Sequence, residues 1–157
     1  MTLLWFRRDL RDFDHPLLAI QGDVLPLFIF DTNILSALNR DDRRVALIFE
    51  YVIRLKKNLQ NKGLDLAIFY GDPYDVIAHL VTKGFTSVVA SGDYDSYAQK
   101  RDHNICRLLP FEYILDTYIF EPKEVQKDGG TPYHVFTPFY KKAQTLFRPH
   151  HAKEYLP

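Results

Sequence analysis

The sequence predicts an α/β fold in which a parallel sheet of about five strands carries helices on both faces. Short, continuous apolar runs alternate with amphipathic segments of helical period. The runs are apolar at consecutive positions, as strands are when both faces of the sheet are covered. Glycines such as Gly63 and Gly84 separate the two kinds of segment. This alternation is typical of a Rossmann-like, doubly wound sheet with right-handed crossovers.

The strands and helices are expected in strict alternation along the chain. The five apolar runs that we expect as strands are 2–6, 24–30, 64–70, 86–91 and 111–115. The segments expected as helices are a short crossover at 16–22, then 43–62, 73–83 and 96–109. A final helix is expected over 137–147, with Thr137 as its N-cap and Pro138 in its first position.

Residues that cap helices support these boundaries. Asp14 precedes the short crossover, Asp41 or Asp42 precedes the long helix, and Asp72 stands before Pro73 at the start of the next. The long helix has an apolar stripe that we expect to face the sheet, formed by Val45, Ile48, Phe49, Val52, Ile53 and Leu59. Cys106 follows Ile105 in an apolar context and is expected in the core.

Composition limits the classes of protein to which the chain can belong. It has 157 residues, 46% of them apolar, and its formal net charge is zero. The whole chain therefore lacks a strongly basic nucleic-acid footprint, although a local basic patch is still allowed. Apolar runs are far shorter than the roughly 20 residues that span a bilayer, and no signal-peptide pattern opens the chain. With a single cysteine, these features predict a cytoplasmic protein without a membrane partner.

Charged residues stand just beyond the ends of several expected strands. Arg7 and Arg8 follow the first strand, Asp31 the second, and Asp93 the fourth. In open parallel sheets, ligands bind beyond the carboxyl ends of the strands, where the strand order reverses. These side chains therefore either form a ligand site or, equally well, pair across neighbouring loops.

Motifs of other nucleotide and hydrolase sites are absent from the sequence. FRRDLRD stands where a dinucleotide site needs its G-x-G-x-x-G loop, and the chain contains neither a P-loop nor a G-x-S-x-G elbow. The six histidines lack metal-ligand spacing with carboxylates. We therefore assign no catalytic and no metal-binding residue. Asp93 and Asp95 are open to two interpretations, an acidic pair or a cap for the helix that begins near Ser96.

Several blocks of the sequence, in order, resemble the DNA photolyase and cryptochrome family. The opening WFRRDLRDFDHPLL is similar to the family's first strand and the loop after it. The other matching blocks are PLFIFD, the long helix from Arg44, YGDP, DYDSYAQKRD and DGGTPYHVFTPFYKKA. Together they cover essentially the whole chain, in the spacing of the family.

The resemblance implies two domains and a light-driven reaction. In this family an N-terminal α/β domain holds an antenna chromophore, and a larger helical domain holds FAD and the damaged DNA. Residues 1–147 match the α/β domain, and 148–157 match the start of a linker to an FAD-binding helical domain that is absent from this chain. The full-length protein would split cyclobutane pyrimidine dimers as a deoxyribodipyrimidine photolyase, a carbon–carbon lyase. The 157-residue chain alone is expected to be inactive.

The resemblance also implies a set of antenna-binding residues. In members with a flavin or deazaflavin antenna, the ligand is lined by residues that match Asp31, Arg44, Asp93 and Asp95. Four further residues would complete the wall: Arg8, Phe28, Phe30 and Tyr97. The places of the folate ligands hold Leu38 and Tyr97-Ala98, which favours FMN or 8-hydroxy-deazaflavin over folate.

Three alternative functions stay open at this point. A cryptochrome, which senses blue light and repairs no DNA, differs from a photolyase mainly in the absent domain. A nucleotide-binding module of the universal-stress or electron-transfer-flavoprotein type shares the sheet order, but SGDYDSY offers one glycine for a phosphate loop. A scaffold that binds nothing is the third. The remaining charges of the opening block, Asp9, Arg11, Asp12 and Asp14, are expected to pair among themselves, to cap the short crossover and to contact the helical domain.

Overall fold

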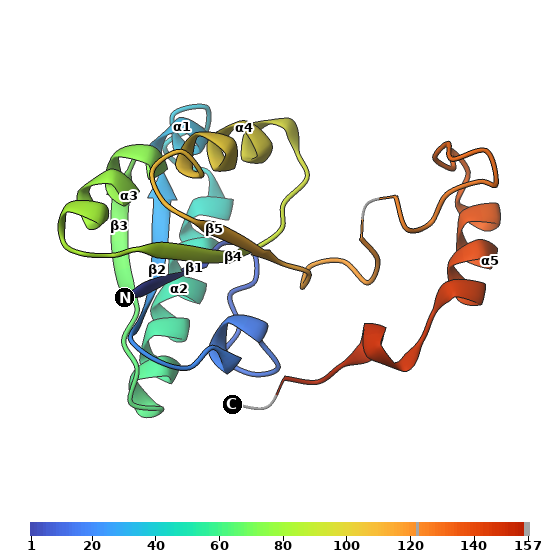
Figure 1. Ribbon diagram of the computed structural model, residues 1–157. Coiled ribbons are helices and arrows are strands. Elements are labelled where there is room, and N and C mark those ends of the chain that lie inside the picture. Colours follow the sequence, from blue (N-terminus) through green and yellow to red (C-terminus); the bar gives the residue numbers. More distant parts are fainter. Residues whose placement is uncertain (122, 156–157) are drawn as a thin grey trace.

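A computed structural model describes residues 1–121 and 123–155. Its centre is one parallel sheet with the strand order β3-β2-β1-β4-β5 (Figure 1). The strands are β1 (Thr2–Phe6), β2 (Val24–Asp31), β3 (Ala67–Gly71), β4 (Ser87–Ser91) and β5 (Phe111–Ile114). The order reverses at β1, which pairs with β2 on one side and β4 on the other. A crevice for a ligand is therefore expected above β1.

Helices connect these strands and continue past the sheet. They are η1 (Pro16–Ala19), α1 (Thr32–Leu35), α2 (Arg43–Asn61), α3 (Pro73–Thr82), α4 (Ser96–Ile105), α5 (Phe136–Leu146) and η2 (Pro149–Ala152). Helices α3 and α4 cover one face of the sheet, and α2 with η1 covers the other. The predicted doubly wound α/β architecture is confirmed. In the described part of the chain, no helix combines the length and the apolar character that a bilayer span requires.

The alternation of side chains along β1 explains why the strand is apolar at every position. Leu3 and Trp5 belong to the core beneath α3 and α4, and Leu4 and Phe6 belong to the core beneath α2. All four are at most 2% exposed. Because helices cover both faces, the central strand has no solvent-facing position and its sequence shows no polar alternation.

Most of the predicted helix starts agree with the structure. The carboxylate of Asp42 accepts a hydrogen bond from the backbone N–H of Arg44, and Asp72 does the same for Tyr74. The prediction of Asp14 as a cap was wrong. The ring of His15 accepts from Leu17 N–H instead.

Two predictions at the ends of other helices were also wrong. Helix α5 begins at Phe136 after Val135, so Thr137 lies inside its first turn and does not cap it. Helix α4 ends at Ile105, and Cys106 turns outward as an exposed thiol. Ile105 takes the buried position, because the end of the helix moves the next residue off its apolar face.

Helix α2 faces the sheet with only its C-terminal half. Val52 and Leu59 from the predicted stripe are fully buried. Ile48, Phe49 and Ile53 are between 40% and 53% exposed, contrary to their predicted contact with the sheet. The N-terminal half of the helix therefore presents an apolar surface, part of which borders the cavity described below.

The charged loop, residues 7–15, contacts distant segments of the chain. The buried carboxylate of Asp9 accepts from Ser91 Oγ and lies 3.1 Å from His15 Nε2. Arg11 forms a two-contact ion pair with Asp116. The charges of this loop were predicted to pair among themselves. That prediction was wrong for these two residues, because Ser91 ends β4 and Asp116 follows β5 at the same edge of the sheet.

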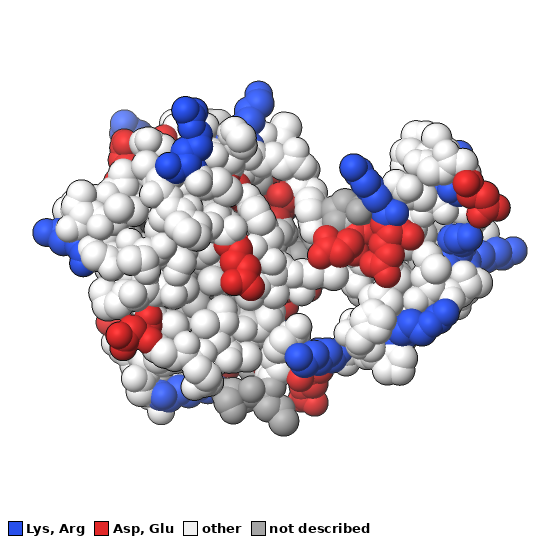
Figure 2. Space-filling model, viewed as in Figure 1, with Lys and Arg blue, Asp and Glu red and all other residues white. Residues whose placement is uncertain are grey.

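The chain after β5 forms an arm, residues 115–155, which leaves the sheet and returns to it. Helix α5 stands away from the α/β unit in Figure 1, and an opening separates the two in Figure 2. Both ends of the arm are attached to the charged loop. Asp116 pairs with Arg11, and the backbone N–H of Tyr155 donates to Asp14 at 2.8 Å. The charged loop is thus the anchor of the arm.

Asp9 is expected to make stability depend on pH. Burial acts to raise its pKa, but hydrogen bonds from His15, Ser91 and the Arg7 backbone outweigh burial and lower the pKa to about 2, from 3.8. Because the pKa of Asp9 is lower in the folded protein than in the unfolded chain, its carboxylate stabilises the fold fully above pH 3.8. This stabilisation is lost as the pH falls toward the folded-state pKa of about 2. Over this window we expect the Asp9 contribution to decline by about 2 kcal/mol.

Urea unfolding at a series of pH values from about 5 to 2 measures this contribution. Asp9→Asn should flatten the decline in the free energy of unfolding over that window. Asp128→Asn is the matched control, since the Asp128 side chain is 99% exposed, and it should retain the decline. An equally steep decline in Asp9→Asn would contradict the assignment.

Candidate functional site

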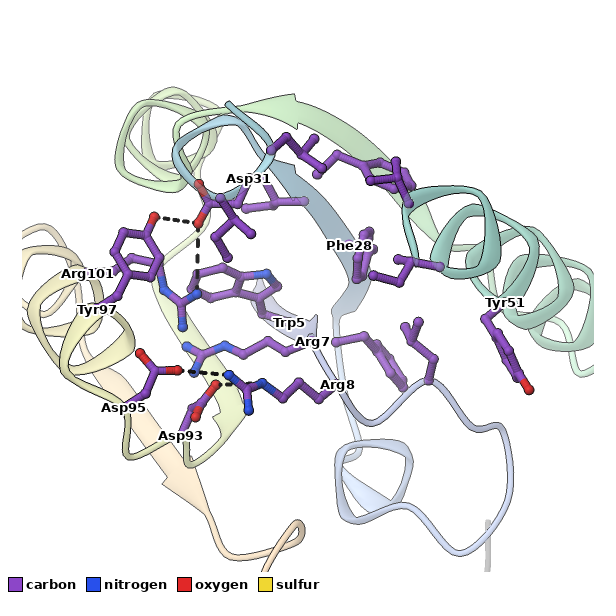
Figure 3. Close-up of a pocket in the computed structure, with 18 of the residues that line it drawn as sticks. Trp5, Arg7, Arg8, Phe28, Asp31, Tyr51, Asp93, Asp95, Tyr97 and Arg101 are labelled. Carbon is purple, nitrogen blue, oxygen red and sulfur yellow. Dashed lines mark hydrogen bonds and ion pairs between the residues drawn. The ribbon is translucent and has the colours of Figure 1, made fainter. Parts of the chain in front are cut away.

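A cavity of about 590 Å³ opens at the carboxyl edge of the sheet, above β1 and β2 (Figure 3). Its volume lies within the roughly 300–1,000 Å³ of small-molecule sites. Its apolar wall comes from three parts of the chain: β2, α1 and the exposed N-terminal half of α2. The wall residues are Phe28, Ile29, Phe30, Ile34, Leu35, Val45, Leu47, Ile48 and Tyr51. Leu10 and Phe6 add to it from the first strand and loop.

The aromatic part of the wall is held by ring contacts. Phe28 and Phe30 meet edge to face at 5.0 Å, and Phe30 lies 6.1 Å from the ring of Phe49 on α2. Such pairs fix the rings beyond the effect of burial alone. A flat apolar ligand would therefore meet a preformed surface at this end of the cavity.

An ion-pair group forms the rim on the opposite side. Arg8 Nε lies 3.1 Å from Asp93, and Arg8 Nη2 donates to Asp95 at 2.8 Å (Figure 3). Asp95 also caps α4 by accepting from the backbone N–H of Ala98, and this hydrogen bond lowers the pKa of Asp95. The interpretation of this stretch as a helix cap is confirmed for Asp95, and Asp93 and Asp95 both border the cavity.

A second polar group stands where β2 meets α4. The hydroxyl of Tyr97 donates to Asp31 at 2.6 Å, and Arg101 Nη1 lies 3.9 Å from the same carboxylate. Burial and the bond to Asp31 raise the pKa of Tyr97 to about 12. Tyr97 therefore stays protonated and keeps its donor role at neutral pH.

Two guanidinium groups lie against the indole of Trp5 at the base of the cavity. Arg7 Cζ is 4.2 Å and Arg101 Cζ 4.8 Å from its ring centroid. The buried carboxylate of Asp102 receives two hydrogen bonds from Arg7, at 2.8 and 2.9 Å, and one from Arg101 Nε. Burial lowers the pKa of Arg7, against the opposing effect of Asp102. This group joins β1 to α4.

Seven of the eight residues proposed from the sequence line this one cavity. They are Arg8, Phe28, Phe30, Asp31, Asp93, Asp95 and Tyr97. Arg44 is the exception, since its guanidinium pairs with Asp42 at 2.5 Å and its side chain is 72% exposed. The Asp42 cap holds Arg44 at the outer start of α2, and the neighbouring Val45 borders the cavity instead.

Sequence reasoning missed two residues at the base of the cavity, Trp5 and Arg101. Both could have been found from periodicity. Trp5 is the second residue from the end of β1 and lies two positions before Arg7, and Arg101 lies one turn after Tyr97 on α4. The apolar residues of α1 were missed because that single turn carries no helical period.

The structure also groups three potential metal ligands that are separated in the sequence. The ligand atoms of Asp9, His15 and Asp116 lie within 4.8 Å of one another. Protein groups already contact all three side chains, since Asp116 pairs with Arg11 and His15 contacts Asp9. These three side chains therefore form the hydrogen-bonded base of the charged loop.

The arrangement of the cavity suits a flat, partly polar ring system. Apolar side chains would cover its faces, carboxylates at two places would accept hydrogen bonds from ring N–H groups, and guanidinium groups would pair with acceptors or anionic substituents. These are binding functions. The predicted contacts of the individual residues with a ligand stay predictions.

Comparisons with known proteins agree with this architecture. The family model described as DNA photolyase matches residues 2–157. A deoxyribodipyrimidine photo-lyase from Halobacterium salinarum is 30% identical over 92% of this chain, and one from Alkalihalophilus pseudofirmus is 33% identical over 90%. The crystal structure of a class III photolyase from Agrobacterium tumefaciens superposes with a TM-score of 0.81, at 26% identity, over 95% of this chain.

The matched region is only part of each relative. The chain spans about a third of the length of these proteins, with 34% of the Halobacterium protein, 32% of the Alkalihalophilus protein and 32% of the Agrobacterium chain covered. The match nevertheless extends over nearly all of the sequence. The chain therefore belongs to the DNA photolyase family.

Proposed function

We propose that this chain is the N-terminal antenna-chromophore domain of a cytoplasmic deoxyribodipyrimidine photolyase. The observation that carries the proposal is the cavity at the carboxyl edge of the sheet, where seven of the proposed residues meet. In this function the domain binds a light-absorbing ring and positions it. The carbon–carbon bonds of the pyrimidine dimer are split elsewhere, at FAD in a helical domain that also binds the damaged DNA.

Side chains of the cavity fit a flavin or deazaflavin antenna. Phe28 and Phe30 would cover the ring, Asp31 and Asp93 would accept from its N–H groups, and Arg8 would pair with acceptor substituents. When bound, the chromophore supplies absorption of near-ultraviolet or blue light. The protein has to keep the ring in one orientation and away from water, and the ring contacts and ion pairs of the wall support both requirements.

FMN or 8-hydroxy-deazaflavin is the proposed ligand, in preference to folate. Leu38 and Tyr97-Ala98 occupy the places of the family's folate ligands. Tyr97 bonds instead to Asp31 across the cavity. The carboxylates and guanidinium groups that a flavin-type ring requires are present along the same rim.

A helical domain of the longer protein is the proposed partner of the arm. Helix α5 and the residue after it leave several apolar side chains in solvent, of which Phe136 is 73%, Tyr140 49% and Phe147 45% exposed. Monomeric domains rarely leave such groups uncovered. The relatives are about three times as long as this chain, and the additional residues would supply the covering surface.

The first test measures the binding of FMN and of 8-hydroxy-deazaflavin by fluorescence titration. Asp93→Asn should weaken binding about tenfold, because an acceptor for ring N–H groups and the partner of Arg8 are both lost. Asp128→Asn, which removes an exposed charge on the arm, should bind as the unaltered chain does. Equal affinity in both variants would count against a ligand at this rim.

The partner is tested by hydrogen exchange of α5. In the 157-residue chain, the backbone amides of α5 (Phe136–Leu146) should exchange rapidly. Among the described residues of this helix only Ala143 is buried, so little packing opposes local opening. In the protein made from the complete gene, the same amides should be protected by at least about a hundredfold. Unchanged exchange would show that α5 has another role.

The repair activity is tested in the longer protein by its action spectrum. Phe30→Ala should reduce photorepair at wavelengths that the antenna absorbs, because it opens the aromatic wall. Repair driven by direct excitation of FAD should be unaffected. If the unaltered protein repairs no pyrimidine dimer at any wavelength, a cryptochrome-type photosensor becomes the better assignment.

A further inference from the structure

In the sequence, Tyr94 stands between the two rim residues Asp93 and Asp95, but its side chain contacts the arm. Its hydroxyl donates to Glu121 Oε2 at 3.2 Å, and its ring lies 5.1 Å from the ring of Tyr118. Asp93 and Asp95, on either side of it, both pair with Arg8 at the cavity. One three-residue stretch therefore contacts the cavity and the first residues of the arm.

Two further features join the rim to this part of the arm. A Cβ added at Gly92 would come within 3.1 Å of the Tyr94 hydroxyl, so the absence of a side chain at Gly92 leaves room for the phenol. A small hollow beside the cavity is lined by Arg8 and Asp93 from the rim and by Thr117 from the arm. The rim and residues 117–121 thus form one contact region.

Hydrogen bonds at both ends of the rim and one from α4 also hold it. Gly92 N–H donates to Ile114 O at 2.9 Å, and Asp95 is fixed by its cap to α4. Between these points, Asp93 has one recorded side-chain partner among the described residues, the 65% exposed Arg8. Gln99 Nε2 on α4 donates to the backbone carbonyl of Tyr94 at 3.2 Å. The side-chain contacts of Tyr94 with the arm add a second restraint to the backbone that carries Asp93.

We propose that Tyr94 is a positioning residue that couples the arm to the rim of the cavity, so that attachment of the arm fixes Asp93 and Asp95 for ligand binding. The proposal rests on the proposed function, since it concerns the same cavity and chromophore. Coupling of this kind is reciprocal. A ligand that pairs with the rim must stabilise residues 117–121, and an attached arm must strengthen ligand binding by the same factor.

Burial and the neighbouring Glu121 carboxylate raise the pKa of Tyr94. The phenol therefore remains a hydrogen-bond donor at neutral pH. Its titratable neighbours among the described residues are Glu121, Tyr118 and the two rim carboxylates next to it in the sequence.

The test combines ligand titration with hydrogen exchange in the 157-residue chain, using FMN and 8-hydroxy-deazaflavin as probes. In the unaltered chain, saturating ligand should slow exchange at residues 117–121. Tyr94→Ala should weaken binding about tenfold and abolish this slowing, because both contacts to the arm are lost. Tyr94→Phe keeps the ring contact with Tyr118 and loses the hydroxyl, so its effects should be smaller.

Tyr133→Phe is the matched control, since it removes a phenol hydroxyl from the arm near Phe139, away from the rim. It should behave as the unaltered chain does. If the unaltered chain binds the ligand and Tyr94→Ala keeps both the same affinity and the slowed exchange, the coupling is overturned. The proposed function would then remain intact. Absence of binding by the unaltered chain would overturn the proposed function, and the coupling with it.

Discussion

The buried carboxylate of Asp102 holds together the two elements on which the cavity depends. It receives both terminal nitrogens of Arg7 from the end of β1 and Nε of Arg101 from its own helix, α4. With Asp102 in place, both guanidinium groups lie against Trp5. Removal of one partner of such a buried pair costs about 3–5 kcal/mol, because the remaining charge is left without compensation. The floor of the cavity and the junction of β1 with α4 therefore form one structural unit.

This unit explains how the fold forms a cavity at the carboxyl edge of the sheet without a glycine-rich loop. In dinucleotide-binding sheets, backbone N–H groups after the first strand approach the ligand. Here Arg7 and Arg8 occupy that position, with Arg7 buried against Asp102 and Arg8 extended along the rim. Bulky side chains replace the glycines at this position, so the cavity is lined by side chains of β1, β2 and the β4–α4 connection. A cavity with apolar walls and a charged rim results.

Much of this arrangement could be predicted from the sequence, because parallel strands place their carboxyl ends at one edge. Asp31 and Asp93 could thus be brought together without coordinates. Arg44 could not be placed in the same way, since its direction depends on the competing carboxylate of Asp42. The exposed half of α2 was missed for a related reason. A helical period shows which residues share a face, as Ile48 and Val52 do, but it does not show where the sheet beneath that face ends.

The abrupt change from an apolar strand to dense charge after Phe6 has a physical explanation in the arm. A strand covered on both faces supplies no polar groups for contacts at its end, so the loop that follows must supply them. Asp9 turns inward to His15 and Ser91, Arg11 holds the start of the arm, and Asp14 holds its end. The same few residues therefore close the sheet edge beside the cavity and attach the segment that carries α5. Any surface that covers α5 is thereby connected, through the charged loop and through Tyr94, to the cavity.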